Sequence, residues 1–136
     1  MKKIILFISI LLFSFAHAQQ RNSTIKDQRG YKVGEIQQNG TIKDERGYKT
    51  GSIDQGTVKD ARGYKAGQIE ESGTIKDARG YKLGKVESDG TVKDAKGYKI
   101  GKVERDGTVK DARGYKIGSV SNPDNPNEIA YWFFFR

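Results

Sequence analysis

Residues 90–120, GTVKDAKGYKIGKVERDGTVKDARGYKIGSV, contain almost the same phrase of 14 residues twice, with a spacing of 17 residues. Each copy has two short stretches rich in Thr, Val, Ile and Tyr, separated by Asp-x-[Arg/Lys]-Gly. Such residues favour pleated strands, and the stretches are too short for helices. The Asp can accept hydrogen bonds from backbone amides of a type I turn, and the Gly can adopt the positive φ that follows. The phrase therefore predicts a β-hairpin.

The same phrase recurs six times from residue 23 onward. The repeated threonines are spaced 17, 16, 17, 17 and 17 residues apart, at Thr24, Thr41, Thr57, Thr74, Thr91 and Thr108. The links between units are QQNG, DQG, EESG, ESDG and ERDG, and each ends in Gly as a tight turn requires. No link is long enough for a crossover helix, so we expect an all-β antiparallel meander of about a dozen short strands.

One hairpin of this kind cannot fold alone. Its roughly four apolar side chains contribute roughly 1.5 to 3 kcal/mol each when buried, whereas ordering the backbone costs roughly 1 to 2 kcal/mol per residue. The units must therefore share a core, either stacked in a row or closed into a ring.

The tail departs from the repeat. After the loop SNPDNPNE, the segment IAYWFFFR occupies the place where another strand is due. A strand that is apolar on both faces is typical of burial on both faces. We therefore expect the hairpins to close into a pseudo-symmetric flower or ring, sealed by an aromatic C-terminal strand that contains Tyr131, Trp132, Phe133, Phe134 and Phe135.

The recurring pattern [GS]-T-[IV]-K-D-x-[RK]-G-Y-K-x-G-x-[IV] identifies a family resemblance. With five full strand-turn-strand segments between its D-x-x-G turns and an aromatic C-terminal segment, the chain resembles the bacterial five-fold β-flower family over residues 23–136. The resemblance implies a compact, pseudo-symmetric arrangement of hairpin petals. It implies no activity, cofactor or site residue, and five or six petals are both compatible with the repeat.

The first 18 residues are typical of a secretory signal peptide: Lys2 and Lys3, an apolar run over residues 4–15, and an Ala16-His17-Ala18 cleavage pattern. The run is shorter than the roughly 18 to 20 apolar residues that span a bilayer, so we expect no transmembrane span after cleavage. We predict a signal peptide (1–18), a short N-terminal segment (19–22) and one β-repeat domain (23–136) of about six 17-residue units plus the closing strand. The protein is expected to be exported to the periplasm or the extracellular space.

The composition argues against catalysis. The chain has no Cys and a single His, His17, which leaves with the predicted signal peptide, so most nucleophile and general-base arrangements and the usual zinc ligands are missing. We expect the six repeated aspartates to cap turns rather than bind calcium, because calcium needs several oxygens that converge on one ion. Glu128 is expected to be a solvated loop residue and Trp132 a core residue. We expect no catalytic, cofactor-binding or metal-binding residue.

The repeat sorts charge in space. The chain has a net charge of +8, and the hairpin stretches hold 18 bases against 7 acids. The bases at the turns could attract a polyanion, or they could form a solvated rim that prevents sheet aggregation; they are Arg29, Arg46, Arg62, Arg79, Lys96 and Arg113. The repeated tyrosines are expected to cover the core between petals, with stacking on sugars or bases as the alternative; they are Tyr31, Tyr48, Tyr64, Tyr81, Tyr98 and Tyr115.

Three functional hypotheses follow from these residues. The first is a secreted, non-enzymatic structural or interaction module of the bacterial envelope or surface. The alternative is a protein that binds glycans or polyanions through the basic rim at the D-x-[RK]-G turns. The partners expected are an acidic glycan, another polyanion or an envelope protein, and an envelope hydrolase with an unusual carboxylate pair is the least favoured class.

Overall fold

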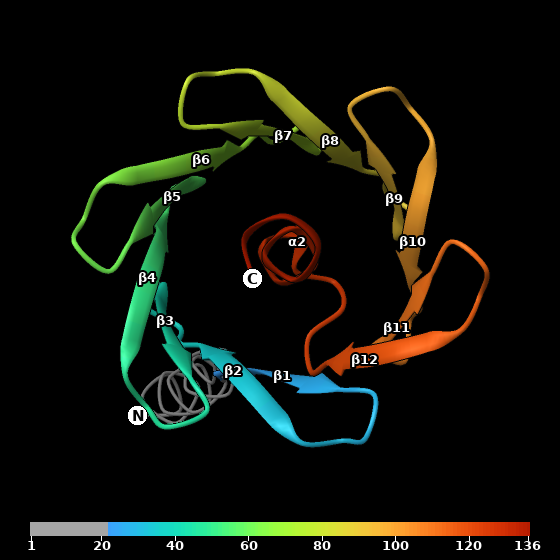
Figure 1. The fold of residues 1–136 in the computed structure, drawn as a ribbon, viewed down its shortest axis with the longest axis horizontal. Helices are drawn as coiled ribbons and strands as arrows, with labels where there is room; N and C mark the ends of the chain where they lie inside the picture. The colour runs from blue at the N-terminus through green and yellow to red at the C-terminus, as the bar shows by residue number, and fades with distance from the viewer. Residues whose placement is uncertain (1–21) are drawn as a thin grey trace, which may run out of the picture.

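The computed structural model describes residues 22–136, which form a closed antiparallel barrel of six hairpins (Figure 1). Consecutive strands pair along the chain, and β1 pairs with β12 to close the ring. The strands are β1 (Ser23–Asp27), β2 (Lys32–Ile36), β3 (Thr41–Asp44), β4 (Lys49–Asp54), β5 (Thr57–Asp60), β6 (Lys65–Ile69), β7 (Thr74–Asp77), β8 (Lys82–Val86), β9 (Thr91–Asp94), β10 (Lys99–Val103), β11 (Thr108–Asp111) and β12 (Lys116–Val120). The predicted all-β meander closed into a ring is confirmed, with six petals. The predicted signal peptide lies outside the described residues.

The D-x-[RK]-G turns form as the sequence predicts. In the first hairpin, Asp27 Oδ1 accepts hydrogen bonds from the backbone N–H of Arg29 at 2.9 Å and of Tyr31 at 3.0 Å. The N–H of Gly30 donates to the carbonyl of Asp27 at 3.0 Å, and Gly30 has a φ of 90°. The same capping bonds recur in the other five turns. The repeated aspartates therefore serve as turn caps.

The links between hairpins are equally tight. Gly40 has a φ of 91°, and a Cβ at this position would collide with the backbone carbonyl of Ile53. The short link instead has Gln55 at φ 50° and Gly56 at φ 85°, as in a two-residue turn of type I′. This shorter turn accounts for the single 16-residue step in the repeat.

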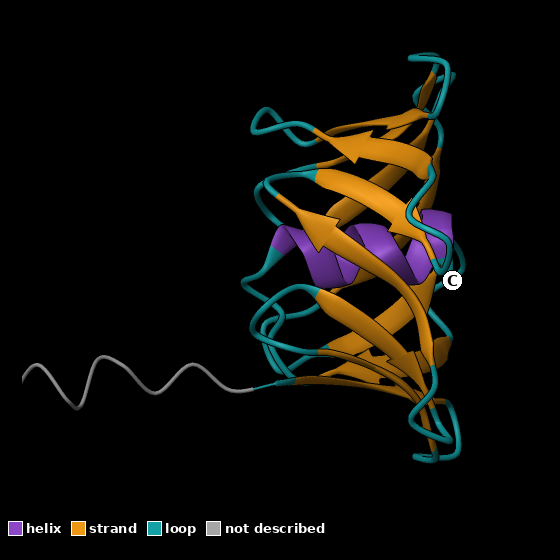
Figure 2. Cartoon of the chain, turned by 90° about the vertical axis from the view of Figure 1, so that its left-hand side faces the viewer, coloured by secondary structure: helices purple, strands orange, loops and turns teal. Residues whose placement is uncertain are grey.

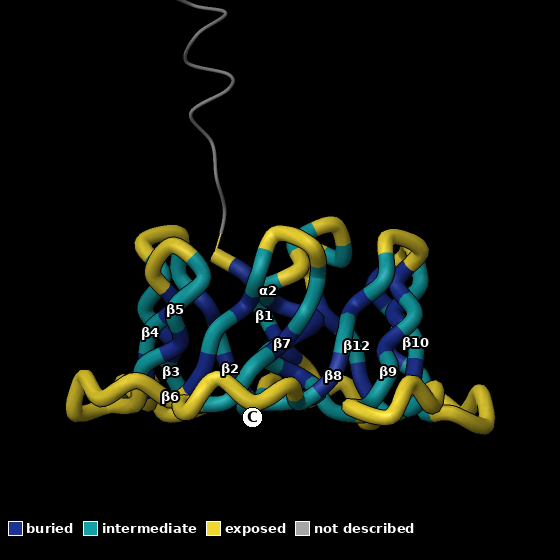
Figure 3. Tube along the Cα trace, turned by 90° about the horizontal axis from the view of Figure 1, so that it is seen from above, coloured by how far each residue is buried: buried dark blue, intermediate teal, exposed yellow. Residues whose placement is uncertain are grey.

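Each hairpin contains a β-bulge at the same place. In the first, Ile25 pairs with Gly34 and Lys26 with Lys32, so Val33 is the extra residue. The equivalent shift occurs in the other five hairpins. Because a bulge bends the strand that carries it, each turn leans away from the barrel axis. Figures 2 and 3 show the resulting petals spread outward at one end of the barrel.

The wall of the barrel contributes a thin inner lining. Every strand directs one Ile or Val inward, and these side chains are at most 7% exposed: Ile25, Ile36, Ile42, Ile53, Val58, Ile69, Ile75, Val86, Val92, Val103, Val109 and Val120. The second strand of each hairpin adds a buried glycine two residues earlier, such as Gly34. The interior of a barrel widens with the number of strands, and about eight strands already make the largest interior that side chains of the wall can fill. The lumen here therefore needs an additional occupant.

The C-terminal tail is that occupant, and it is helical. The helix α2 (Pro126–Ala130) continues into one π-helical turn, η1 (Tyr131–Phe135), inside the barrel (Figures 1 and 2). The predicted aromatic C-terminal strand is therefore wrong. All strand edges are already paired around the ring, so a further strand in the lumen would leave its backbone N–H and C=O groups without partners, whereas a helix pairs them internally.

The helical form also distributes the aromatic side chains around the lumen. Four consecutive rings meet the buried glycines of four successive hairpins: Trp132 at Gly118, Phe133 at Gly101, Phe134 at Gly84 and Phe135 at Gly67. A Cβ at Gly67, Gly84 or Gly101 would lie 2.5 to 2.6 Å from a ring carbon. Trp132 is 5% exposed, and the three phenylalanines and Tyr131 are half-buried against the core. The missing side chains of the wall therefore make room for the aromatics of the tail.

Gly101→Ala tests this contact, with Gly51→Ala as its matched control. At Gly51 an added Cβ would meet the corresponding backbone carbonyl, that of Lys59, but no aromatic ring. Overpacking typically costs about 1 to 3 kcal/mol, so Gly101→Ala should lower the free energy of unfolding by about that much more than Gly51→Ala in urea denaturation. Equal losses in the two variants would show that the Phe133 ring does not occupy this space.

Trp132→Ala tests the contribution of the tail to stability. Removing a buried aromatic side chain typically costs about 3 to 5 kcal/mol, and we expect a loss of that size in chemical denaturation. Tyr98→Ala is the control, because this ring is 69% exposed and its removal should change stability by about 0.5 kcal/mol or less. A Trp132→Ala protein as stable as the wild type would contradict the central position of the tail.

Candidate functional site

The petal rim is the set of six D-x-[RK]-G-Y-K turns at the wide end of the barrel. The six predicted contact residues all lie here and are exposed, one at each petal tip: Arg29, Arg46, Arg62, Arg79, Lys96 and Arg113. None of them forms an ion pair with another described residue. The structure thus arranges the six bases as a ring of separate tips and does not bring them together in one pocket.

The tyrosines of the rim project into solvent. Their exposed fractions lie between 66% and 69% in all six petals, so the expectation that they cover the core is wrong. Their backbone groups hold the turn, since the N–H of Tyr31 donates to Asp27 Oδ1 and the carbonyl of Tyr31 accepts from Asp27 N–H. The bulge turns the phenol away from the barrel, and the neighbouring bulge residues Val33, Leu83, Ile100 and Ile117 pack against the core instead.

The petal tips carry less charge than the complete hairpin stretches. They hold twelve Lys or Arg and seven Asp or Glu, a net charge of +5. The remaining six lysines of the hairpin stretches lie on the strands of the outer wall rather than at the tips. Three of these form ion pairs with glutamates of the links: Lys76 with Glu70 at 3.0 Å, Lys93 with Glu87 at 3.2 Å and Lys110 with Glu104 at 3.2 Å. Among the twelve bases at the tips, Lys32 pairs with Glu35 at 3.1 Å, and the others form no ion pair with a described residue.

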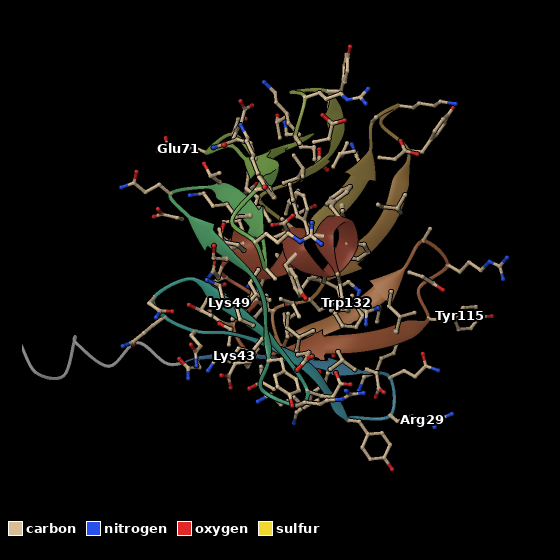
Figure 4. All side chains as sticks on the ribbon, turned by 60° about the vertical axis from the view of Figure 1, so that its left-hand side comes forward. Arg29, Lys43, Lys49, Glu71, Tyr115 and Trp132 are labelled. Atoms are coloured by element: carbon tan, nitrogen blue, oxygen red, sulfur yellow. The ribbon has the colours of Figure 1, made fainter. Side chains whose placement is uncertain are left out.

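The opposite end of the barrel is acidic and rich in amides. The links carry Asp54, Glu70, Glu71, Glu87, Asp89, Glu104 and Asp106, with Arg105 as their one base. Hydrogen bonds from the backbone N–H groups of Thr91 and Thr108 lower the pKa values of Asp89 and Asp106 below their usual range. Beside these links, an open hollow of about 900 Å³ is lined by side-chain amides that include Asn22, Gln37 and Asn122. Figure 4 shows Glu71 at this end, opposite Arg29 and Tyr115 at the rim.

The plug helix is the C-terminal helix inside the barrel, made of α2 and η1. Glu128 lies in its first turn and is fully buried. The expectation of a solvated loop residue is therefore wrong. Ser23 Oγ donates to Glu128 Oε2 at 2.5 Å, and the N–H of Asn122 donates to Oε1 at 3.1 Å. Burial raises the pKa of Glu128 to about 7, and the two hydrogen bonds oppose that rise. The carboxyl group therefore joins β1 to the C-terminal tail. The repeat pattern does not predict this contact.

Two local signals in the sequence point to this arrangement. Ser23 stands where the other five units have the Gly that ends a link, so the first unit alone offers a hydroxyl. The segment Asn125-Pro126-Asn127-Glu128 has the pattern of a helix start, with an N-cap Asn, a Pro and a Glu three residues after the cap. In the structure, Asn125 Oδ1 accepts from the N–H of Asn127 at 2.9 Å. The five aromatics that follow favour strands, which concealed this signal.

Most carboxyl groups of the described residues are engaged in turns, placed on separate links or buried. No group of three or more acidic side chains within residues 22–136 is placed to hold a metal ion. The repeated aspartates are occupied as turn caps, and Glu128 is inaccessible to solvent. Over the same residues, no helix is long and apolar enough to cross a membrane. The exposed bases and phenols of the rim lie at the surface, and among these bases only Lys32 forms an ion pair with a described residue, Glu35.

Comparison with known proteins shows the family. The model of the 5-fold beta-flower protein family matches residues 22–136, and the chain belongs to this family. Searches of the curated proteins and of the solved structures found no significant match. The resemblance identified from the repeat is confirmed, although this barrel has six petals.

The pH dependence of stability tests the buried carboxyl group. Because the folded-state pKa of Glu128 is about 7 against an ordinary value of 4.5, the folded protein favours the protonated form. The stabilisation of the folded state by this bound proton is complete below pH 4.5 and is lost as the pH rises through 7, with a magnitude on the order of 3 kcal/mol. In urea denaturation, Glu128→Gln should therefore gain stability relative to the wild type as the pH is raised from 4.5 to 8.

Glu71→Gln serves as the control for this experiment. Glu71 is an exposed link residue, so its replacement should leave the pH profile of the wild type unchanged. Parallel profiles for the wild type and Glu128→Gln would contradict the buried, protonated state of this carboxyl group.

Proposed function

We propose that the protein is an exported, non-enzymatic interaction module of the bacterial envelope or surface that binds polyanions through its petal rim. The observation that carries this proposal is the set of six tyrosines, each 66% to 69% exposed and each flanked by two exposed bases, one of which makes no ion pair with the described residues. Exposed aromatic and basic side chains in alternation are typical of surfaces that bind polyanions.

Comparison among the six copies supports the same function. The units have diverged at the residue after Asp, which is Gln, Glu or Ala, and at the bulge, which is Val, Thr, Ala, Leu or Ile. The Asp and the Gly of the turn are constant, and the turn geometry explains them. The Tyr and the following Lys are equally constant, yet their side chains make no contact that the turn requires. Binding by the rim would explain why the Tyr and the Lys are constant although the turn does not need their side chains.

The scarcity of side chains suited to catalysis supports a binding role. The chain has no Cys, and its single His is residue 17. The six aspartates are equivalent copies with the same hydrogen bonds, whereas an active site needs groups in different environments whose pKa values are pushed apart. Glu128 is the one carboxyl with a strongly raised pKa among the described residues, and it lies inside the barrel.

Charge reversal at alternate petals tests this function. The mature chain should bind heparin, and its retention should fall as salt rises because binding releases counterions. The variant Arg29→Glu, Arg62→Glu and Lys96→Glu should bind about tenfold or more weakly and show a smaller salt dependence, as measured by heparin affinity chromatography and salt titration.

The matched control reverses three charges away from the rim, with Lys85→Glu, Lys102→Glu and Arg105→Glu. Its change in net charge is the same, so a specific role of the rim predicts much weaker effects. Equal losses in the two triple variants, or unchanged elution of the rim variant, would overturn the proposed function.

A further inference from the structure

The petal rim is flat. Figures 2 and 3 show all the tips projecting at one level at the wide end of the barrel, with the C-terminus at the same end. The repeated bulge produces this geometry, since each hairpin bends at the same residue pair. The nearly equal exposure of the six tyrosines, from 66% to 69%, shows that the tips share one environment. The surface is a broad ring around the end of the plug helix.

The chemistry of this ring matches the interface of an anionic bilayer. Tyrosine is enriched at the level of lipid headgroups, where its ring is buried and its hydroxyl stays hydrated. Lys and Arg near an anionic membrane each strengthen binding by about fivefold. Every tip presents one Tyr between two such bases. At the centre, the rings of Phe133, Phe134 and Phe135 are half-buried, and the exposed Arg136 stacks on Trp132 with its guanidinium 4.0 Å from the ring centroid.

A plane fits this arrangement better than a linear polymer does. Proteins that follow a single strand of nucleic acid provide a continuous basic groove, whereas the bases here stand on separate tips. A flat, fluid array of phosphates can contact all six tips at once. The acidic links lie at the other end of the barrel and would face away from the anionic surface, so one orientation is favoured over the reverse.

We propose that the petal rim is a docking surface for anionic lipid bilayers, which the protein binds peripherally with its barrel axis perpendicular to the membrane. The inference rests on the proposed function, because it names the partner of the same rim. Lipid phosphates are held by the bases of the tips, and the tyrosines enter the headgroup layer. Because six weak contacts act together, binding depends on a surface that spans several petals.

Vesicle cosedimentation of the mature chain, residues 19–136, tests this inference. Binding is expected to phosphatidylcholine vesicles that contain phosphatidylglycerol, is absent without the anionic lipid, and weakens as salt rises. The rim variant with Arg29→Glu, Arg62→Glu and Lys96→Glu should lose on the order of a hundredfold in partition coefficient. The triple variant with Lys85→Glu, Lys102→Glu and Arg105→Glu is the control for net charge.

A second variant separates the bilayer from soluble polyanions. Tyr31→Ser, Tyr64→Ser and Tyr98→Ser remove three exposed rings without a change in charge, and the turns keep their backbone hydrogen bonds. Vesicle binding should fall about tenfold, while retention on heparin should stay at the level of the wild type. Thermal unfolding of both variants should match the wild type, since these side chains lie outside the core.

The outcomes are distinguishable. Retention on heparin without binding to anionic vesicles would overturn the bilayer inference and leave the proposed function standing. Failure to bind either would overturn both. Vesicle binding that the tyrosine variant leaves unchanged would also overturn the inference, because the contact would then be a charge interaction that any anionic surface provides.

Discussion

The structure depends on the need to fill a wide lumen. Twelve strands make a ring without free edges, but each strand supplies only one Ile or Val to the interior, and the alternate inward position of each second strand is a glycine. An α-helix with its side chains is about 10 to 12 Å across, and the C-terminal helix occupies this space. Its aromatic rings fit against Gly118, Gly101, Gly84 and Gly67 in turn. The hairpins and the tail therefore stabilise each other, and neither has a core alone.

This constraint divides the molecule into a repeated wall and a single plug. The wall repeats each surface feature around the axis, so the same Tyr and bases appear at every petal. The plug carries the singular features: the buried Glu128, its bond to Ser23 and the stacked pair of Trp132 and Arg136. A surface built in this way offers many equal contacts rather than one pocket, and the proposed function uses this multivalency toward extended anionic partners.

Much of the barrel follows from local residues. The Asp and Gly of each D-x-[RK]-G turn predict the hairpins, because their hydrogen bonds and positive φ are properties of four or five consecutive residues. Short links predict the antiparallel meander, and the inadequate core of one unit predicts a shared one. The antiparallel meander also predicts the positions of the rim bases, since it places all turns of one kind at the same end of the barrel. The exposure of the tyrosines does not follow, because it depends on how far the bulge bends each petal away from its neighbours.

The sequence by itself determined the hairpins, the antiparallel order and the charge of the turns, since each depends on contacts within one repeat or between adjacent ones. Tertiary structure alone decided the form of the tail. Five aromatics favour a strand locally, but the closed ring offers no edge for pairing, so the backbone satisfies its hydrogen bonds in a helix. The same closure buries Glu128 against Ser23, 105 residues away in the chain. Contacts over such separations exist only after the ring has closed around its plug.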